Sequence, residues 1–262
     1  MGTNNSAGKR LRAKIEAGEA AFGLWAGIPS SLTAELAAAA GYDYVCVDLQ
    51  HGLSDEATMV SMFQATQAAG SALLARLAWN EPWLIMRALD LGAVGVILPL
   101  IDNAGEARRA VESCRFPPVG RRSYGPIRAE LAMGSAAPQE VDEALCIAMI
   151  ETREGIENLE EIAATPGLDG LYIGPSDLSI ALGLAPGGVV ADPSRDRPKL
   201  AEAIERIRQV CEAHGLIPGM HCGGGEVASQ YARDGFRLIT VGVDTSLFKA
   251  MIGRELSAAR AV

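Results

Sequence analysis

The sequence predicts an α/β fold of the (β/α)8 class, a TIM barrel. Eight short apolar runs alternate with helical patterns along the whole chain. The runs are apolar rather than alternating, which is typical of strands buried on both faces of a parallel sheet. A chain of 262 residues is long enough for one barrel or one doubly wound domain. The open sheet is the alternative, but eight nearly equal units favour the closed barrel.

The expected elements follow one another in strict order. Helical segments rich in Ala, Glu and Arg separate the strands, and no linker divides the chain, so we expect one barrel domain over residues 1–262. Several of these segments end in a glycine, as expected for helix C-caps: Gly41, Gly70, Gly92 and Gly215. The strands are expected at residues 20–28, 42–50, 71–77, 95–101, 146–151, 170–175, 216–222 and 236–243.

Two segments break this rhythm. Residues 116–143 form a long insertion after the fourth strand, and residues 183–198 form a Gly- and Pro-rich loop after the sixth. Long loops in compact domains are usually functional, so we expect both to shape substrate specificity. The arginines of the insertion are candidates to bind a substrate carboxylate, with a solvated surface loop as the alternative: Arg121, Arg122 and Arg128.

Composition narrows the class of partner. Apolar residues make up 49% of the chain and charged residues 21%, which is ordinary for a globular protein. The net charge of −9 argues against a nucleic-acid partner, and no apolar run approaches the roughly 20 residues needed to span a bilayer. The five cysteines share no metal-ligand spacing, and the N-terminal segment has no apolar stretch typical of a secretory signal. We therefore expect a soluble, cytoplasmic protein that acts on a small molecule.

Ionisable and polar residues gather at the expected carboxyl ends of the strands, where TIM barrels carry their active sites. Each has an ordinary structural explanation when taken alone. His51 fits a loop histidine, Arg76 an ion-pair partner and Asp177 the N-cap of the next helix. Their convergence on one rim of the barrel nevertheless predicts a site. The residues are Asp48, Gln50 and His51 at the end of the second strand, Arg76 at the end of the third, Glu151 at the end of the fifth, and Ser176 and Asp177 at the end of the sixth.

The residue types indicate the chemistry of this rim. Glu151 and Asp177 form an all-oxygen pair, which suits a hard divalent cation such as Mg²⁺, Mn²⁺ or Co²⁺, whereas zinc would normally recruit more His or Cys. Such a cation can chelate a 2-oxo acid and stabilise its enolate, with Arg76 adding positive charge at the keto oxygen. His51 is the candidate proton carrier, and Asp90 is a candidate to orient its ring.

Lysine content separates two ways of making an enolate. The chain has four lysines, and none lies at an expected strand end, so a Schiff-base mechanism lacks its nucleophile. This observation favours metal-dependent chemistry. His221 ends the seventh strand and is in a position to line the pocket, but the sequence assigns it no role.

The ordered motifs resemble those of the HpcH/HpaI aldolase family, the class II pyruvate aldolases related to the citrate lyase β subunit and macrophomate synthase. The resemblance runs from about Phe22 to about Phe248 and rests on the order of five pieces. They are DLQHG from Asp48, ARLAWNEP around Arg76, GVILPLI, IETREG around Glu151, and IGPSDLS around Asp177.

The resemblance implies a (β/α)8 barrel of the phosphoenolpyruvate/pyruvate-binding type, assembled as a homohexamer (a trimer of dimers) with the last helix exchanged between partners. It implies that Glu151 and Asp177 hold the metal, and that Arg76 binds the keto oxygen of pyruvate. It further implies that His51 transfers protons with the help of Asp90. The backbone from Gly174 to Asp177, including Ser176, would receive the pyruvate carboxylate, with Asp48 close by.

One position departs from the common pattern, because many members of the family carry Glu where this chain has Gln50.

The expected activity is reversible cleavage of a 4-hydroxy-2-oxo acid to an aldehyde and pyruvate, or a pyruvate analogue such as hydroxypyruvate. The alternatives are another enolate-forming lyase, such as a citrate-lyase-like acyl-CoA lyase or a 2-oxo-acid decarboxylase, and a barrel that binds a 2-oxo acid without turning it over.

Overall fold

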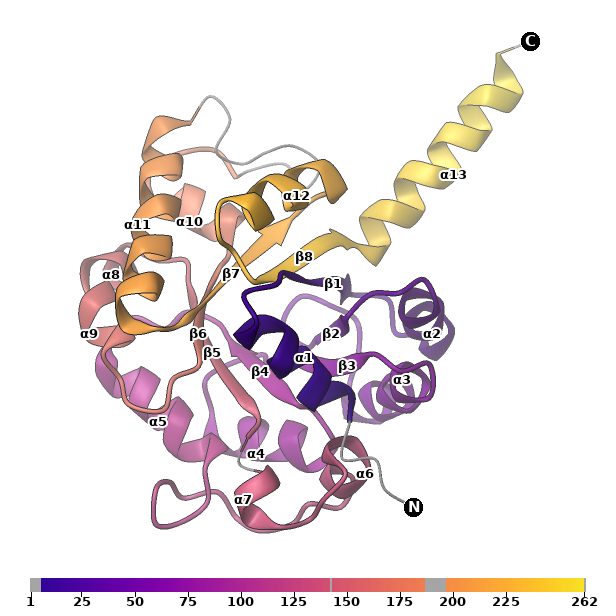
Figure 1. The fold of residues 1–262 in the computed structure, drawn as a ribbon. Helices are drawn as coiled ribbons and strands as arrows, with labels where there is room; N and C mark the ends of the chain where they lie inside the picture. Colours follow the sequence, from indigo (N-terminus) through magenta and orange to yellow (C-terminus); the bar gives the residue numbers. More distant parts are fainter. Residues whose placement is uncertain (1–5, 142, 187–196, 262) are drawn as a thin grey trace.

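The computed structural model describes residues 6–141, 143–186 and 197–261. Eight parallel strands form a closed barrel in which each strand pairs with the next and β8 pairs with β1 (Figure 1). The predicted fold class is therefore confirmed. The strands are β1 (Ala21–Ala26), β2 (Tyr44–Asp48), β3 (Ala72–Arg76), β4 (Gly95–Leu98), β5 (Leu145–Ile150), β6 (Gly170–Ile173), β7 (Ile217–Cys222) and β8 (Leu238–Val243).

Helices surround the barrel, and the four glycines predicted as C-caps all have positive φ, between +67° and +107°. These helices are α1 (Ala7–Glu16), α2 (Ser31–Ala39), α3 (Glu56–Ala68), α4 (Pro82–Asp90), α5 (Ala104–Cys114), α6 (Ala129–Met133), α7 (Pro138–Val141), α8 (Arg153–Glu157), α9 (Leu159–Ala163), α10 (Pro175–Ala181), α11 (Pro198–His214), α12 (Gly225–Arg233) and α13 (Asp244–Arg260). The last helix, α13, projects away from the barrel (Figure 1).

Two tyrosines fill the interior of the barrel because glycines stand beside them. A Cβ atom at Gly23 would lie 2.0 Å from the ring of Tyr44, and one at Gly219 would lie 2.4 Å from the ring of Tyr172. The two hydroxyls are satisfied inside the barrel, since both approach Thr240. The barrel is therefore a packed core with polar contacts, and the site must lie above it.

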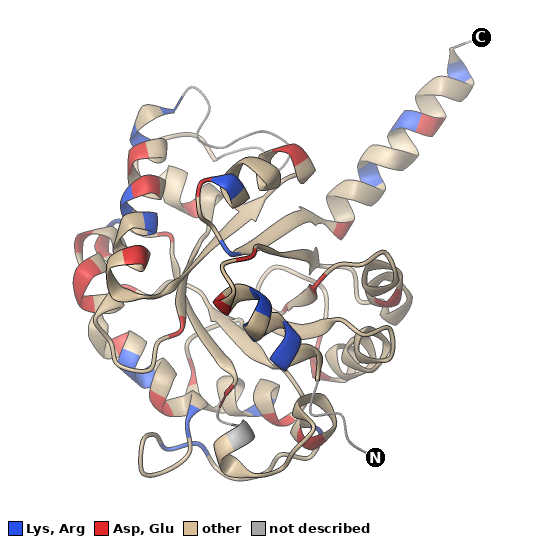
Figure 2. Cartoon of the chain, viewed as in Figure 1, with Lys and Arg blue, Asp and Glu red and all other residues tan. Residues whose placement is uncertain are grey.

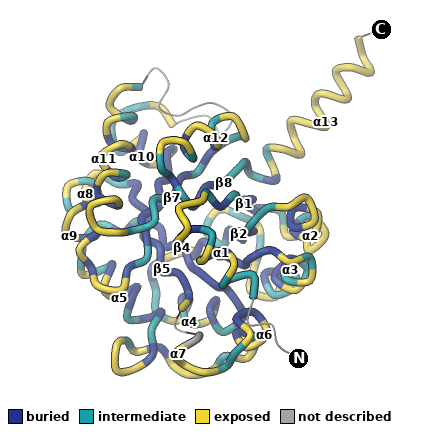
Figure 3. Tube along the Cα trace, viewed as in Figure 1, coloured by how far each residue is buried: buried dark blue, intermediate teal, exposed yellow. Residues whose placement is uncertain are grey.

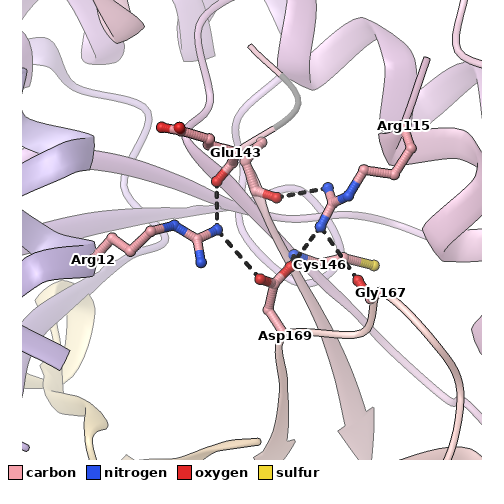
Figure 4. Close-up of polar contacts among 7 residues, drawn as sticks. Arg12, Arg115, Glu143, Cys146, Gly167 and Asp169 are labelled. Carbon is pink, nitrogen blue, oxygen red and sulfur yellow. Dashed lines mark hydrogen bonds and ion pairs between the residues drawn. The ribbon is translucent and has the colours of Figure 1, made fainter. Parts of the chain in front are cut away.

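The amino end of the barrel is closed by α1 and a cluster of ion pairs (Figure 4). Asp169, which precedes β6, pairs with Arg12 of α1 at 3.2 Å and with Arg115, which follows α5, at 2.8 Å. Its carboxylate also accepts a hydrogen bond from the backbone N–H of Cys146. Ion pairs therefore connect α1, the end of α5 and the start of β6 at this end of the barrel.

The insertion at residues 116–143 follows α5, which runs from the carboxyl end of β4 back toward the amino end of β5. The insertion therefore lies at the amino end of the barrel, and its expected part in substrate specificity stays a prediction. The loop at 183–198 falls largely on residues 187–196, outside the described residues. No helix in the described ranges is both long and apolar enough to cross a membrane.

Candidate active site

A cavity of about 280 Å³ opens at the carboxyl end of the barrel. It brings together seven of the residues singled out in the sequence: Asp48, His51, Arg76, Glu151, Gly174, Ser176 and Asp177. Parallel strands place their carboxyl ends on one rim, so residues far apart in sequence meet there. The predicted convergence is therefore observed in the structure.

Most charged residues lie on helices and loops rather than on strands (Figure 2). Asp48 and Arg76 are the only Asp, Glu, Lys or Arg residues within the eight strands of the described structure, and they occupy paired positions at the ends of β2 and β3. The Arg76 guanidinium donates from Nε to Oδ1 of Asp48 at 2.8 Å and from Nη2 to Oδ2 at 2.5 Å. It also lies 5.0 Å from the centre of the Trp25 ring, and the Trp25 indole N–H donates to Asp48. Arg76 is thus locked in orientation.

The Asp48 carboxylate is occupied by hydrogen bonds and is therefore not available as a base. Backbone N–H groups of Gln50 and His51 donate to its Oδ1, in addition to the donors of Arg76. Burial alone would raise the pKa of Asp48, but the hydrogen bonds and charge of Arg76 outweigh it and hold the pKa below its usual range. Asp48 is therefore an ionised anchor for Arg76 and for the loop that carries His51.

Glu151 follows β5 and is 3% exposed. Its Oε1 accepts a hydrogen bond from the backbone N–H of Leu100 at 3.0 Å. Leu100 has φ +53°, a left-handed conformation that branched and bulky residues rarely adopt, so backbone strain accompanies this contact. Burial, reinforced by the neighbouring Asp177 charge and opposed by the Leu100 hydrogen bond, raises the pKa of Glu151 to about 7.

Gly174 gives Glu151 its space. A Cβ at Gly174 would lie 2.3 Å from Oε2 of Glu151, although the glycine has an ordinary φ of −93°. Gly174 is the N-cap residue of α10, and Ser176 and Asp177 stand in the first turn of that helix. The alternative that Asp177 is the N-cap is therefore wrong. Asp177 is exposed to the cavity, whereas Glu151 is buried beneath it.

These two carboxylates fit a magnesium-like cation. No group of three or more His, Cys, Asp or Glu side chains in the described parts of the chain is arranged to hold a metal. Two carboxylates next to an open cavity leave the other positions to substrate and water, which is how Mg²⁺ is usually bound. A bound cation would also offset the burial of the Glu151 charge and its repulsion by Asp177, the two main causes that raise the pKa of Glu151.

His51 lies at the mouth of the cavity with an exposed side chain, but the predicted pairing with Asp90 does not form within this chain. Asp90 is the last residue of α4, which returns from the carboxyl end of β3 to the amino end of β4. There its Oδ1 accepts a hydrogen bond from Nη2 of Arg122 at 2.9 Å. The sequence pattern placed Asp90 in a helix, as observed, but it did not show at which end of the barrel Asp90 lies.

Several other expectations also need correction. Gln50 does not line the cavity, and its Oε1 is buried without a hydrogen-bond partner among the described residues. Arg122 is fully buried over the ring of Phe116, so it is neither in the pocket nor in a solvated loop. Arg121 instead pairs with Glu112 on the surface, and Arg128 donates to the carbonyl of Leu91; both lie away from the cavity.

Sequence reasoning gave no role to some residues that line the cavity. These residues lie inside or beside uniformly apolar runs, in which positions that face the cavity cannot be told from positions that face the helices. They are Trp25, Leu53, Met149, His221, Val243 and Thr245. A histidine within such a run was the one feature of the sequence that could have indicated a cavity residue.

Comparison with known proteins agrees with this geometry. The family model for HpcH/HpaI aldolase/citrate lyase matches residues 21–250. A 4-hydroxy-2-oxo-heptane-1,7-dioate aldolase from Salmonella dublin is 36% identical, over 94% of this chain and 92% of that protein. The crystal structure of a HpcH/HpaI aldolase/citrate lyase family protein from Burkholderia cenocepacia J2315 superposes with a TM-score of 0.84 at 33% identity, covering 97% of this chain and 98% of that one.

A more distant structure shares the fold. It is a citrate lyase beta subunit from M. tuberculosis complexed with oxaloacetate and magnesium, with a TM-score of 0.56 at 19% identity, and the match covers 88% of this chain and 93% of that one. The family match spans most of the sequence, and the residues quoted above supply the rim of its barrel. This chain belongs to the HpcH/HpaI aldolase/citrate lyase family and is a carbon–carbon lyase of the class II pyruvate aldolase type.

Proposed function

We propose that this enzyme cleaves 4-hydroxy-2-oxo acids reversibly to an aldehyde and a 2-oxo acid donor, pyruvate or hydroxypyruvate, and that it depends on a divalent metal. The observation that carries the proposal is the cavity that places the locked Arg76 guanidinium on the same rim as the Glu151 and Asp177 carboxylates. The two carboxylates can hold a divalent cation, and that cation together with the fixed guanidinium can bind the oxygens of a chelating 2-oxo acid. The relative from Salmonella dublin, a 4-hydroxy-2-oxo-heptane-1,7-dioate aldolase, supports the substrate class.

Glu151 and Asp177 would hold Mg²⁺, Mn²⁺ or Co²⁺, which supplies Lewis acidity to the donor's keto group when bound. Arg76 would hold the keto oxygen as it gains negative charge, and its pairing with Asp48 fixes the guanidinium before substrate arrives. The backbone from Gly174 to Asp177, with Ser176, would receive the donor carboxylate, since this segment borders the cavity at the start of α10.

His51 would move the proton. In the cleavage direction it takes the proton of the C4 hydroxyl, and in the condensation direction it returns that proton to the aldehyde oxygen. Its exposed position at the mouth of the cavity supports this role, because the aldehyde must enter from that side. Two donors from Gln50 and His51 to Asp48 hold the loop that carries the ring.

The test is proton NMR of pyruvate in D₂O with chelator-stripped enzyme. We expect the methyl signal to decay when Mg²⁺, Mn²⁺ or Co²⁺ is restored and to persist without metal, because exchange requires the enolate. Glu151→Gln should abolish the metal-dependent decay, and His214→Gln, in α11, should not. Exchange that needs no metal would contradict the proposed chemistry. Binding of pyruvate without exchange would instead support a barrel that does not turn its ligand over.

The chain also carries an unpaired apolar surface. Helix α13 projects from the barrel with Asp244 as its one buried residue in the described range, and its apolar side chains are exposed (Figures 1 and 3). Their exposed fractions run from 45% to 62%, at Leu247, Phe248, Met251, Ile252 and Leu256. A helix with such a stripe is normally buried against another element.

We propose that α13 packs against a second copy of the chain in a homohexamer built as a trimer of dimers. The outer face of β1 and β8 presents a groove of about 420 Å³ where a barrel helix would otherwise lie, with Phe22, Ala228 and Val241 in its lining. Light scattering should give six times the chain mass of 27.4 kDa. Phe248→Asp with Ile252→Asp should reduce that mass, whereas Ser257→Asp, on the same helix, should not. A monomeric native enzyme would refute the assembly.

Such an assembly would also explain Asp90. Because Asp90 lies at the amino end of its own barrel, it can orient His51 only if it reaches the cavity of another copy. We therefore expect Asp90→Asn to lower turnover in the assembled enzyme. Mixing Asp90→Asn with His51→Ala chains should restore part of the activity, because some cavities would then combine intact residues from both.

All five cysteines of the chain are free and buried, which supports the expected cytoplasmic location.

A further inference from the structure

His221 stands in the cavity next to the proposed electrophilic centre. It is the fifth residue of β7, and its ring meets the Trp25 ring edge-on with 5.0 Å between the centroids. The Arg76 guanidinium lies over the same Trp25 ring, 5.0 Å from its centre. Trp25 therefore joins His221 and Arg76 into one cluster on the floor of the cavity.

The imidazole of His221 is polar but has no polar partner in the described part of the chain. Its ring contacts Trp25, and neither ring nitrogen makes a hydrogen bond to the described residues. The side chain is half-buried and lines the cavity. The residue thus has a hydrogen-bonding capacity that the fold itself does not use.

The ring is neutral under ordinary conditions. Burial, together with the nearby Arg76 charge, lowers the pKa of His221 to about 4, and the Asp48 charge opposes this only in part. A neutral imidazole offers one N–H donor and one acceptor nitrogen. It is therefore suited to a hydroxyl group, which can both donate and accept, and it is less suited to a carboxylate.

The layout of the rim indicates which part of the substrate faces this ring. The three substituents of a keto carbon lie in one plane, about 120° apart. In the proposed complex the keto oxygen faces Arg76 on β3 and the carboxylate faces Gly174 before α10. The remaining direction is toward β7, β8 and β1, where His221, Val243 and Trp25 line the cavity. The substituent in that direction is C3, the carbon that becomes nucleophilic.

We propose that His221 is a specificity-determining residue that hydrogen-bonds a hydroxyl on C3 of the donor, so that the enzyme prefers a 3-hydroxy-2-oxo acid such as hydroxypyruvate over pyruvate. This inference rests on the proposed function, because it assumes that a 2-oxo acid lies between Arg76 and Gly174. A methyl group in the same position would leave the imidazole without a partner, and sites built to hydrogen-bond a substrate discriminate strongly against analogues that lack the group.

The test compares the two donors in the same enzyme. Exchange of C3 protons in D₂O is followed by NMR for hydroxypyruvate and for pyruvate with the Mg²⁺-loaded protein, after subtraction of the enzyme-free rate. We expect the ratio of kcat/KM values to favour hydroxypyruvate in the native enzyme. In His221→Leu the ratio should shift toward pyruvate by about tenfold to a hundredfold, since one buried hydrogen bond is lost.

Two further variants separate hydrogen bonding from packing. His221→Asn and His221→Gln each keep a donor near one of the two ring nitrogens, so one of them should recover part of the preference. His214→Leu is the matched control, because His214 lies at the exposed end of α11 and pairs with Glu160. That variant should leave the ratio unchanged. Calorimetric binding of both donors to the Mg²⁺-loaded proteins gives the same ratio without relying on turnover.

The outcomes are distinct. A ratio unaltered by His221→Leu, or a native enzyme that prefers pyruvate, overturns the role of His221 while leaving the proposed aldolase intact. Absence of exchange with either donor and every metal overturns the proposed function and this inference together. A large fall in Mg²⁺ affinity of His221→Leu without any donor would make His221 a metal ligand and would likewise overturn its assignment to C3.

Discussion

Asp48 and Arg76 face each other at the last paired position of β2 and β3, and two hydrogen bonds join their side chains end to end. Both side chains are less than 10% exposed. The contact therefore does more than neutralise charge, because it fixes the plane of the guanidinium that borders the cavity. Asp48 is best described as a positioning residue whose effect on the reaction passes through Arg76.

This relationship predicts a non-additive pair of substitutions. Arg76→Ala should lower kcat/KM by about 10²–10³, the typical loss for one oxyanion-stabilising donor. Asp48→Ala should also lower kcat/KM, and it should destabilise the fold by about 3–5 kcal/mol because Arg76 is left buried and unpaired. The double variant should be no slower than Arg76→Ala alone. Independent, multiplying losses in steady-state kinetics would show that Asp48 acts on the substrate directly.

Gly174 should tolerate no side chain. In Gly174→Ala the new Cβ would meet Oε2 of Glu151 at 2.3 Å, so the carboxylate must move. Because a displacement near 1 Å at a reacting centre lowers rates by about 10²-fold, we expect a loss of that size in donor exchange. Mg²⁺ affinity, measured by calorimetry, should fall as well. Gly224→Ala is the control, since its Cβ would meet nothing within 4 Å and its φ is −173°; equal effects of the two changes would contradict the steric argument.

The pKa of His221 predicts a pH dependence of folding. The pKa is lowered from 6.5 to about 4 in the folded chain, so between these values the unfolded state binds more protons. Stability due to this residue is therefore complete above pH 6.5 and falls as the pH drops toward 4, by at most about 3 kcal/mol. Glu151 has the opposite sign, because its pKa rises from 4.5 to about 7 and its contribution is lost as the pH rises through that range.

A difference measurement isolates His221 from Glu151. The free energy of unfolding in urea with chelator present is compared between the native enzyme and His221→Leu at several pH values. The difference should change between pH 4 and pH 6.5 and remain constant above it, because the Glu151 contribution is common to both proteins. A difference that is constant over the whole range would mean that the folded and unfolded pKa values of His221 are equal.

The amino end of the barrel should affect stability without affecting chemistry. Asp169→Ala leaves Arg115, which is 12% exposed, without its carboxylate partner and removes the link to Arg12 (Figure 4). We expect a loss of about 2–4 kcal/mol in unfolding free energy. The value of kcat/KM per folded molecule should stay near that of the native enzyme, because the cavity lies at the other end of the strands. Loss of turnover without loss of stability would refute this division.

Local patterns sufficed for the fold and for most of the rim. Apolar runs, helical periods and the glycines that end helices predicted the barrel, and the strand ends predicted Glu151, Asp177 and Arg76 as neighbours. These predictions succeed because all strands of a parallel barrel point their carboxyl ends in the same direction. A polar residue that follows an apolar run therefore lies at the rim formed by these ends.

The sequence by itself determined the barrel and the carboxylate pair, whereas tertiary structure decided how the side chains are used. That Asp48 anchors Arg76, that Leu100 is strained against Glu151, and that His221 faces the cavity depend on register and on inward orientation, which a uniformly apolar run does not encode. Asp90 is the clearest case: its spacing is visible in the sequence, but the direction of α4 carries it to the far end of its own barrel, because a helix that joins parallel strands must run back against them.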